Sequence, residues 1–292
     1  MILPDFVIPS RVNQRWSYSG IDSLESCLDK KHFASYPHDI TYNYNSRGFR
    51  DAEWPTILSE LQNAIWCVGD SFTVGLGSPV SHTWPNILQQ TTQCRTINVS
   101  MDGASNMWIA RKVLKILTQL QPELIIVHWS YLHRREASVA EAQLKWWQTY
   151  YKNIKDTSWP QCPTPDDFAS LPKFIQHEII TKHAPGPFYQ IGDEDRVMHF
   201  DLNNISIDLD MSNTIECIKA VESQATTTKI LHSFIPDYMS NHGKNNFRDQ
   251  LLSLIQNFVG EIPVIDHARD GHHYDIKTSE YFVQQIQQVL NQ

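Results

Sequence analysis

The chain has 292 residues, of which 41% are hydrophobic and 19% charged, so one large domain with a packed core is expected. The formal net charge is −8 and basic residues occur only in short pairs such as Arg134-Arg135, which argues against a nucleic-acid partner and against an anionic membrane surface. No apolar run reaches the length of a membrane span, and residues 1–10 do not resemble a signal peptide. The five cysteines show no disulfide or metal spacing, so we expect a cytoplasmic protein with reduced thiols.

Residues 1–60 are polar, aromatic and rich in turn-forming residues, and we expect an irregular extension there that packs on the core. From residue 61 onward, short apolar runs rich in β-branched residues recur without strict alternation, a pattern typical of parallel strands that are buried on both faces. The five predicted strands are Ala64–Val68, Thr96–Val99, Leu124–Trp129, Lys229–Phe234 and Ile262–Ile265.

Helical patterns separate these runs, because apolar residues recur every three or four positions in 109–120, 247–258 and 282–290. The first of these helices has Ser105 or Asn106 as its candidate N-cap and Pro122 as its stop. Strands that alternate with helices predict an α/β fold: a three-layer, flavodoxin-like αβα domain over residues 61–292 with a central parallel sheet of about five strands.

The third and fourth predicted strands are separated by roughly 95 residues, far more than one crossover connection requires. We expect an insertion at about 135–225 that covers the sheet without forming a separate domain. Its predicted elements are a helix at Arg134–Ile154 and another at Phe174–His183, with a proline-rich segment between them.

The motif Gly69-Asp70-Ser71-Phe72-Thr73-Val74-Gly75 directly follows the first predicted strand. A serine at the carboxyl end of a parallel strand faces the crevice in which open α/β sheets bind ligands. A phosphate-binding P-loop is excluded because the motif has no Gly-Lys-Ser/Thr, and a Gly-x-Ser-x-Gly elbow is excluded because Thr73 stands where glycine is required. Taken alone, the motif fits equally well a turn in which Asp70 and Ser71 only cap a helix.

A nucleophilic serine needs a base, normally a histidine, and that base needs an orienting carboxylate. The run Asp270-Gly271-His272-His273 lies after the fifth predicted strand and before the last helix, at the same edge of the sheet as Ser71. We therefore predict that Ser71, Asp270 and His273 are catalytic, with His272 as an alternative base.

These motifs resemble a known family. Gly69–Gly75 resembles the first block of the SGNH (GDSL-like) hydrolase superfamily, and Asp270-x-x-His273 resembles its last block, whose spacing favours His273 over His272. The segment Asn45–Asp51 is similar to an upstream segment of some bacterial members.

The segment Asn98–Asn106 resembles the second block of the superfamily. The resemblance implies an oxyanion hole built from the backbone N–H groups of Ser71 and Gly103, and we add Asn106 as a candidate third donor. The third block, Gly-x-Asn-Asp, is missing, because Trp129–Arg134 contains no asparagine. The candidate substitutes for that asparagine are Asn106, Ser130, His133 and Arg134.

Other polar and aromatic groups receive weaker interpretations. The cluster of His267, Asp270, His272, His273 and Asp275 lacks a helical His pair, so we expect no metal site and no cofactor. His177-Glu178 lacks the second histidine of a zinc-protease motif, and Trp146-Trp147 is expected in a core rather than in a sugar site. Arg47 and Arg50 are expected to form ion pairs with Asp51 or Glu53 rather than to bind a substrate carboxylate.

The resemblance implies a serine-dependent esterase that acts on small acyl esters, including O-acetyl groups on carbohydrate. Two alternatives remain open: an O-acyltransferase, and a catalytically silent carbohydrate- or partner-binding module built on the same fold. A structural protein of a larger assembly is a third, weaker alternative. The expected partner is a small-molecule or carbohydrate ester, and the oligomeric state is left open.

Overall fold

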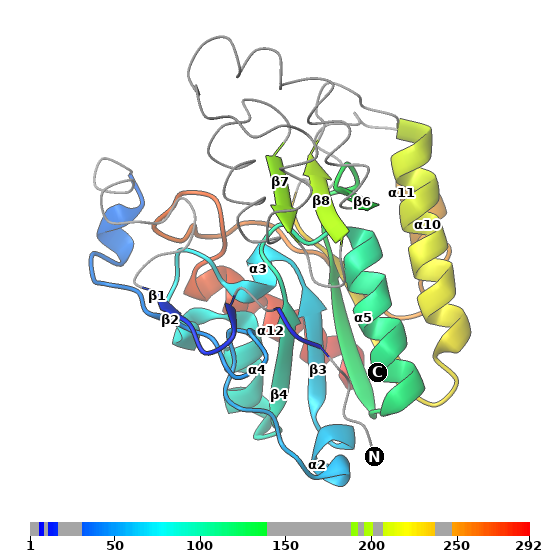
Figure 1. The fold of residues 1–292 in the computed structure, drawn as a ribbon, viewed down its shortest axis with the longest axis horizontal. Coiled ribbons are helices and arrows are strands. Elements are labelled where there is room, and N and C mark those ends of the chain that lie inside the picture. Colours follow the sequence, from blue (N-terminus) through cyan, green and yellow to red (C-terminus); the bar gives the residue numbers. More distant parts are fainter. Residues whose placement is uncertain are drawn as a thin grey trace, which may run out of the picture.

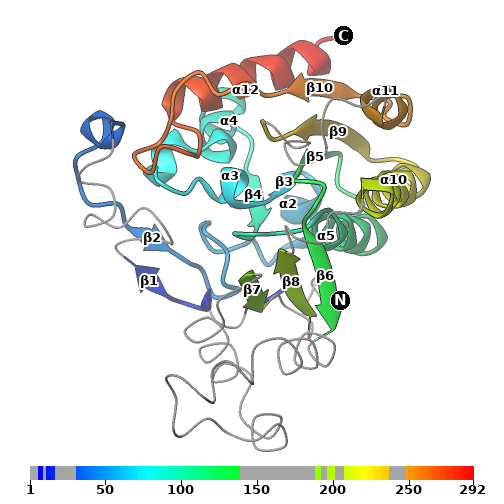
Figure 2. The same ribbon diagram turned by 90° about the horizontal axis from the view of Figure 1, so that it is seen from above.

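The computed structural model describes residues 6–8, 11–16, 31–138, 188–191, 196–200, 207–236 and 247–292. At its centre is a five-stranded sheet (Figure 1) in which every pair of neighbours is parallel. The strand order is β10-β9-β5-β3-β4, as labelled in Figure 2. Its strands are β3 (Ile65–Gly69), β4 (Thr96–Ser100), β5 (Leu124–Trp129), β9 (Lys229–Phe234) and β10 (Phe258–Glu261). Read from β4, the strands follow the flavodoxin-like order 2-1-3-4-5, which confirms the predicted fold class.

Helices cover both faces of this sheet (Figure 2). One face carries α4 (Trp84–Thr92) and α12 (Ile276–Leu290), and the other carries α5 (Asn106–Gln119) and α10 (Ile207–Gln224). Helix α5 begins where predicted, because the Ser105 side chain accepts a hydrogen bond from the Trp108 N–H, and it ends just before Pro122. None of the helices in the described ranges has the combined length and apolar character needed to cross a bilayer.

The last strand of the sheet is the main departure from the predicted elements. The prediction of a strand at 262–265 is wrong: Phe258, Gly260 and Glu261 pair with β9, whereas Pro263 lacks the N–H that a ladder requires. The helix expected at 247–258 is correspondingly shorter, because α11 spans Phe247–Leu252. The other short helices within the described ranges are α2 (Leu58–Gln62), α3 (Ser71–Val74), η3 (Phe33–Ser35) and η4 (Val80–His82).

The described part of the N-terminal extension packs on the core. Phe6 and Ile8 are buried in the main hydrophobic cluster, and the Ile8 N–H donates to the Arg47 carbonyl. Strand β1 (Arg15–Trp16) pairs antiparallel with β2 (Tyr42–Asn43). The extension is thus tied to the domain by both apolar burial and backbone hydrogen bonds.

The predicted insertion contributes a second small sheet beyond the carboxyl edge of the central strands (Figure 1). It is antiparallel, in the order β6 (Arg135–Ser138), β8 (Arg196–Phe200), β7 (Phe188–Ile191). The prediction of a helix starting at Arg134 is wrong for 135–138, because these residues pair with β8; the rest of that helix and the one predicted at Phe174–His183 lie outside the described residues. Helix α10 packs on α5 and so belongs to the layer that covers the central sheet.

Candidate active site

Ser71 is the first residue of α3, directly beyond the end of β3. Asp70 caps this short helix, since its Oδ1 accepts the Phe72 N–H at 3.0 Å, and Gly75 closes it with a φ of 75° that favours glycine. The neighbours of β3 are β4 on one side and β5 on the other, so the chain leaves β3 at the switch point of the sheet. The turn formed by residues 69–77, here called the nucleophile turn, therefore occupies the usual ligand-binding position of an open α/β sheet.

Asp270 and His273 lie together in the loop between β10 and α12 (residues 262–275), here called the histidine loop. His273 Nδ1 is 2.6 Å from Asp270 Oδ2, and the side chains are 6% and 0% exposed. The other carboxylate oxygen, Oδ1, accepts the backbone N–H groups of His272 and His273 at 2.9 and 3.0 Å. These bonds fix the carboxylate and orient the imidazole, so that its Nε2 is the nitrogen left for a reacting group.

The electrostatics of this loop keep Asp270 ionised. Burial alone would raise its pKa, but the hydrogen bond and charge of His273 and the two backbone N–H groups outweigh burial and lower the pKa from 3.8 to about 2. Burial, together with the charge of His273, lowers the pKa of the neighbouring His272. The ring of His272 has Tyr131 Oη 3.5 Å from its Nε2 and is not the ring held by the carboxylate, which favours His273 as the base.

The histidine loop and the nucleophile turn lie against each other. The ring centroid of Phe72 is 4.7 Å from that of His273 and 4.8 Å from that of Tyr274. The Gly77 carbonyl accepts the Arg269 N–H at 3.3 Å. Within the described part of the chain no hydrogen bond joins Ser71 Oγ to His273, although both residues are at least 95% buried at this junction. In ligand-free enzymes such bonds are often long and tighten only with substrate bound.

The two backbone N–H groups predicted for an oxyanion hole are available as hydrogen-bond donors. Among the described residues, neither the Ser71 N–H nor the Gly103 N–H has a hydrogen-bond acceptor. Gly103 lies in the turn after β4 with a φ of 74°, and this turn is held to β3 because the Met101 N–H donates to the Gly69 carbonyl at 3.2 Å. Two N–H groups without an acceptor, on turns that follow neighbouring strands, suit the charge that develops in acyl transfer.

Asn106, the candidate third donor, is engaged elsewhere. Its Nδ2 donates to the Ser130 carbonyl at 3.2 Å and to Thr214 Oγ1 at 3.1 Å, and its Oδ1 accepts the Ser130 N–H at 2.8 Å. Both hydrogens of the amide are therefore used in joining α5, β5 and α10. We do not retain Asn106 as an oxyanion donor, because turning it inward would leave these buried groups unsatisfied.

A charged network occupies the place of the missing third block. The Asp70 side chain is fully buried, and its Oδ2 accepts Ser130 Oγ at 2.7 Å and Arg134 Nη1 at 2.6 Å. His133, another candidate substitute for the asparagine, instead has its ring 5.4 Å from that of Tyr131. The sequence does not predict the pairing of Asp70 with Arg134, since nothing local links a residue after β3 with a residue between β5 and β6.

Buried polar groups of β5 and β9 hold the histidine loop on the central sheet. His128 on β5 is fully buried, with Nδ1 2.7 Å from Ser233 Oγ and Nε2 3.2 Å from Tyr274 Oη. Burial lowers the pKa of His128 from 6.5 to about 3, so this ring is neutral and bridges two hydroxyl groups. Since Tyr274 directly follows His273, the bridge anchors the loop to the central sheet.

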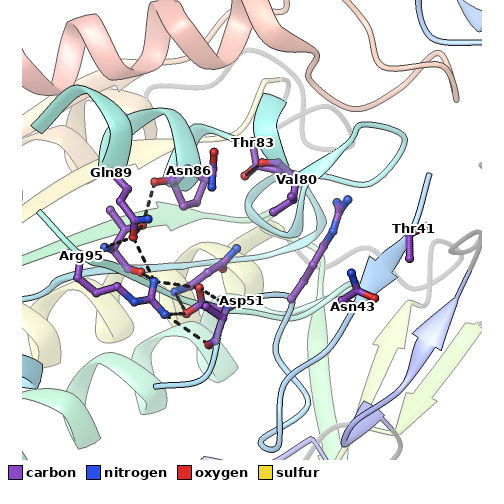
Figure 3. A pocket seen from close by; sticks show the side chains of 13 residues that line it. Thr41, Asn43, Asp51, Val80, Thr83, Asn86, Gln89 and Arg95 are labelled. Atoms are coloured by element: carbon purple, nitrogen blue, oxygen red, sulfur yellow. Dashed lines mark hydrogen bonds and ion pairs between the residues drawn. The ribbon is translucent and has the colours of Figure 1, made fainter. Parts of the chain in front are cut away.

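The guanidinium of Arg50 binds backbone carbonyls of the nucleophile turn and of the residue that follows it. This guanidinium lies 4.1 Å above the Tyr42 ring and donates to the carbonyls of Val74, Gly75 and Ser78 at 2.5 to 3.1 Å. A pocket of about 320 Å³ is lined by Asp51, Gln89 and Arg95, among others (Figure 3). Arg50 and Asn98 also line it. Ser71, Asp270 and His273 do not line this pocket, so it is separate from the candidate active site.

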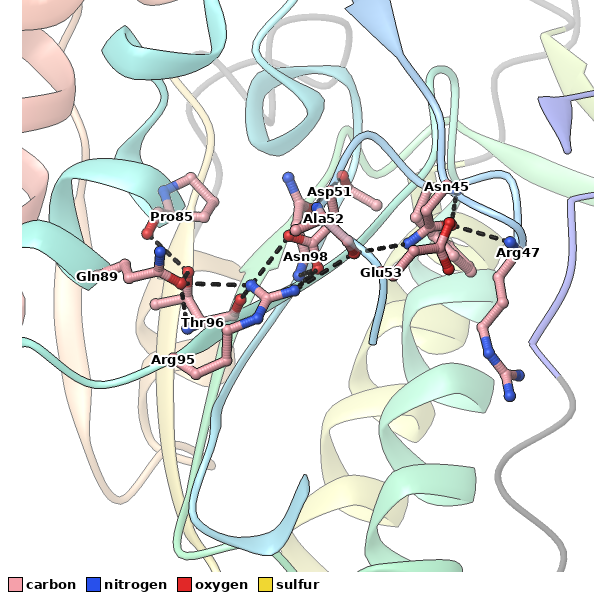
Figure 4. Close-up of polar contacts among 12 residues, drawn as sticks. Asn45, Arg47, Asp51, Ala52, Glu53, Pro85, Gln89, Arg95, Thr96 and Asn98 are labelled. Carbon is pink, nitrogen blue, oxygen red and sulfur yellow. Dashed lines mark hydrogen bonds and ion pairs between the residues drawn. The ribbon is translucent and has the colours of Figure 1, made fainter. Parts of the chain in front are cut away.

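The acidic residues expected to pair with Arg47 and Arg50 have other partners (Figure 4). Asp51 forms a two-bond ion pair with Arg95, with distances of 3.0 and 2.9 Å, and accepts the Asn98 N–H of edge strand β4. Glu53 accepts two hydrogen bonds from Ser46. The predicted ion pairs with Asp51 or Glu53 are therefore wrong, and the loop instead covers the edge of the sheet.

The remaining candidate sites gain no geometric support. Within the described ranges, no three His, Cys, Asp or Glu side chains form a set that could bind a metal ion. The aromatic pair Trp146-Trp147 and the segment with His177 and Glu178 lie outside the described residues.

Comparisons with known proteins find similar solved structures but no similar sequence or family model. No family model matches the sequence, and no curated protein sequence matches it. Similar solved structures include that of TesA (12% identity, 78% of this chain and 97% of that chain, TM-score 0.42). Others are a GDSL-like lipase from Bacteroides thetaiotaomicron (10% identity, 82% and 92%, TM-score 0.36) and a family two carbohydrate esterase from Clostridium thermocellum solved with cellohexaose (10% identity, 82% and 66%, TM-score 0.40). The chain is thus similar, over about four fifths of its length, to solved structures that include a GDSL-like lipase and a carbohydrate esterase.

Proposed function

We propose that this protein is an SGNH-type serine hydrolase that cleaves small acyl esters, with Ser71 as nucleophile, His273 as general base and Asp270 as the carboxylate that orients it. One observation carries the proposal: the buried Asp270–His273 pair lies against the turn that bears Ser71, with 4.7 Å between the rings of Phe72 and His273. A serine, an imidazole and an orienting carboxylate on one rim are the set that acyl transfer requires.

In the first half of the reaction, Ser71 Oγ attacks the acyl carbon while its proton passes to His273 Nε2. The negative charge of the tetrahedral intermediate falls on the former carbonyl oxygen, where the N–H groups of Ser71 and Gly103 can donate to it. Collapse of the intermediate breaks the ester bond, and His273 returns the proton to the leaving alkoxide. Asp270 stabilises the imidazolium throughout and holds the tautomer that receives the proton at Nε2.

In the second half, water attacks the acyl-enzyme and gives its proton to His273. The intermediate then releases the carboxylic acid, and the proton returns to Ser71 Oγ. An alcohol that replaces water would make the same site an O-acyltransferase. The resemblance stated above extends the substrate class to O-acetyl groups on carbohydrate.

Hydrolysis of p-nitrophenyl acetate by the wild type, Ser71→Ala and His273→Ala tests the proposal. We expect each substitution to lower kcat by a factor on the order of 10⁴ to 10⁶, because nucleophile and base act as a unit. His272→Ala is the matched control: it removes a neighbouring imidazole that is not paired with Asp270, so its kcat should stay within about tenfold of wild type. Equal turnover by all four proteins would show that the assigned residues are wrong.

A fluorophosphonate probe separates the enzyme from the silent binding module. Labelling of the wild type that is lost in Ser71→Ala supports a nucleophilic serine, whereas an unlabelled wild type favours the module, which the missing third-block asparagine motivates. Hydrolysis and transfer are separated by adding methanol or glycerol to the assay and quantifying the free acid against the new ester.

A further inference from the structure

We propose that Arg134 is a positioning residue that compensates indirectly for the missing third-block asparagine: it neutralises Asp70 and holds the loops around the oxyanion site, without itself donating to the substrate. The inference rests on the proposed function, which it deepens. The juxtaposition that carries it is a buried ion pair at the residue next to the nucleophile: Arg134 Nη1 lies 2.6 Å from Asp70 Oδ2.

Asp70 places a carboxylate in the interior directly beside Ser71. Its side chain is fully buried, and its oxygens accept from the Phe72 N–H, Ser130 Oγ and Arg134. The first two bonds come from neutral groups, so Arg134 is the cation that compensates this charge. An uncompensated carboxylate would oppose the negative charge that forms on the substrate oxygen at the adjacent N–H groups.

Arg134 also connects the loops that would form the oxyanion hole. Besides Asp70 at the end of β3, its Nη1 lies 3.4 Å from the Ala104 carbonyl, in the turn after β4, and 2.7 Å from Ser130 Oγ, after β5. Ala104 directly follows Gly103, whose N–H is one of the two proposed donors. The planar guanidinium stacks 4.8 Å from the Tyr131 ring, which restricts its orientation.

Two other candidate substitutes for the asparagine, Asn106 and Ser130, use their polar groups elsewhere. Both amide hydrogens of Asn106 are used by Ser130 and Thr214, and the hydroxyl of Ser130 itself donates to Asp70. Arg134 is thus the remaining candidate whose contacts reach the nucleophile turn and the Gly103 turn at once. Its effect is exerted through Asp70 and Ala104 rather than by contact with the substrate.

A double-mutant cycle on Asp70 and Arg134 tests this role, with kcat and KM measured on an activated ester. We expect Arg134→Gln to lower kcat about 100-fold, comparable to the loss of one oxyanion donor, with KM changed less than threefold. The double variant Asp70→Asn/Arg134→Gln should have a kcat at least tenfold higher than that of Arg134→Gln alone, because it has no uncompensated carboxylate at position 70. Arg134→Lys keeps the charge but not the fork geometry, and should lose about tenfold.

Arg135 provides the matched control. It forms its own two-bond ion pair with a fully buried carboxylate, Asp210, but this pair joins the chain to α10 and does not touch the nucleophile turn. Arg135→Gln therefore removes an equivalent interaction one residue away, and we expect its kcat to stay within threefold of wild type. A merely structural ion pair would lower stability in both variants without the specific fall in kcat.

The outcomes separate this inference from the proposed function. A wild type without Ser71-dependent labelling by the fluorophosphonate probe would refute the proposed function and the role of Arg134 together. If Ser71-dependent activity is present, a folded Arg134→Gln with kcat within threefold of wild type, or a double variant no faster than the single one, would refute the role of Arg134 alone. If Arg134→Gln does not fold, the double variant and Arg134→Lys decide: a kcat for the lysine variant equal to that of wild type would overturn the proposal.

Discussion

Gly77 lies directly against the carboxyl group of Asp270: a Cβ atom at position 77 would come 2.9 Å from Asp270 Cγ and 2.8 Å from Ala268 Cβ. Gly77 also has a φ of +76°, and its N–H donates to Tyr42 Oη at 2.8 Å. The nucleophile turn therefore fits against the proposed catalytic carboxylate only because position 77 has no side chain.

We expect Gly77→Ala to displace Asp270 and to lower both stability and activity. Positive φ and the close contact together should lower the free energy of unfolding by roughly 2 to 4 kcal/mol, and kcat should fall because the imidazole is no longer held in place. Gly271→Ala is the control, since it has nearly the same φ of +74° but meets only an ordinary contact at 3.5 Å. Urea unfolding should rank the two variants in that order; an equal loss would show that contact with Asp270 is unimportant.

Replacement of Asp270 by asparagine should lower kcat about 10³- to 10⁴-fold while leaving the fold intact, because an amide no longer fixes the reactive tautomer of His273. The same variant should change acid stability. The folded pKa of about 2 lies below the unfolded value of 3.8, so the contribution of Asp270, about 2 kcal/mol, is present above pH 3.8 and lost as pH falls through 2. The free energies of unfolding of wild type and Asp270→Asn, measured with urea at a series of pH values, should therefore converge between pH 4 and 2.

The guanidinium of Arg50 should be needed for the shape of the nucleophile turn. Arg50 reaches the carbonyls of Val74 and Gly75 with Nη1 and that of Ser78 with Nη2, whereas all donors of a lysine sit on one nitrogen, so Arg50→Lys is expected to lower the free energy of unfolding by about 2 kcal/mol. The turn should also shift, with a fall in kcat of roughly tenfold or more. Arg47→Lys, in the same loop but stacked over Trp54, should leave kcat unchanged; similar losses in both variants would argue against a specific role for Arg50.

His128 should make the fold sensitive to mild acid. Its folded pKa of about 3 lies below the unfolded value of 6.5, so between these pH values the unfolded chain binds a proton at this residue and the folded protein does not. The free energy of unfolding therefore falls as pH drops from 6.5 to 3, by up to about 1.4 kcal/mol per pH unit. His128→Asn removes this term. Urea unfolding should show the advantage of wild type over His128→Asn shrinking steadily across that range.

Another buried group titrates in the same pH range. Burial raises the pKa of Asp51 to about 6, although the positive charge of Arg95 lowers it. Asp51 is present in both wild type and His128→Asn, so its contribution cancels when the free energies of unfolding of the two proteins are subtracted. A difference between the two proteins that stays constant from pH 6.5 to 4 would show that His128 is protonated in the folded state.

The sequence by itself determined the central architecture. Four of the five strands lie within one residue of their predicted ends, because a strand buried on both faces needs a short, continuous run of β-branched and apolar residues. Helix α5 was predictable from its period, its Ser105 cap and Pro122. The contact between Asp270 and His273 was also accessible, since three residues on one loop can bring a carboxylate to an imidazole.

Only the tertiary structure decided which distant polar groups meet. The partners of Asp70, Arg50 and Asn106 lie on other elements of the fold, and the pairing of the last strand depends on its register against β9. Local sequence encodes burial and turn geometry, since both repeat over a few residues. A hydrogen bond between residues far apart in the chain has no such local pattern, and it becomes defined only when packing fixes the distance between them.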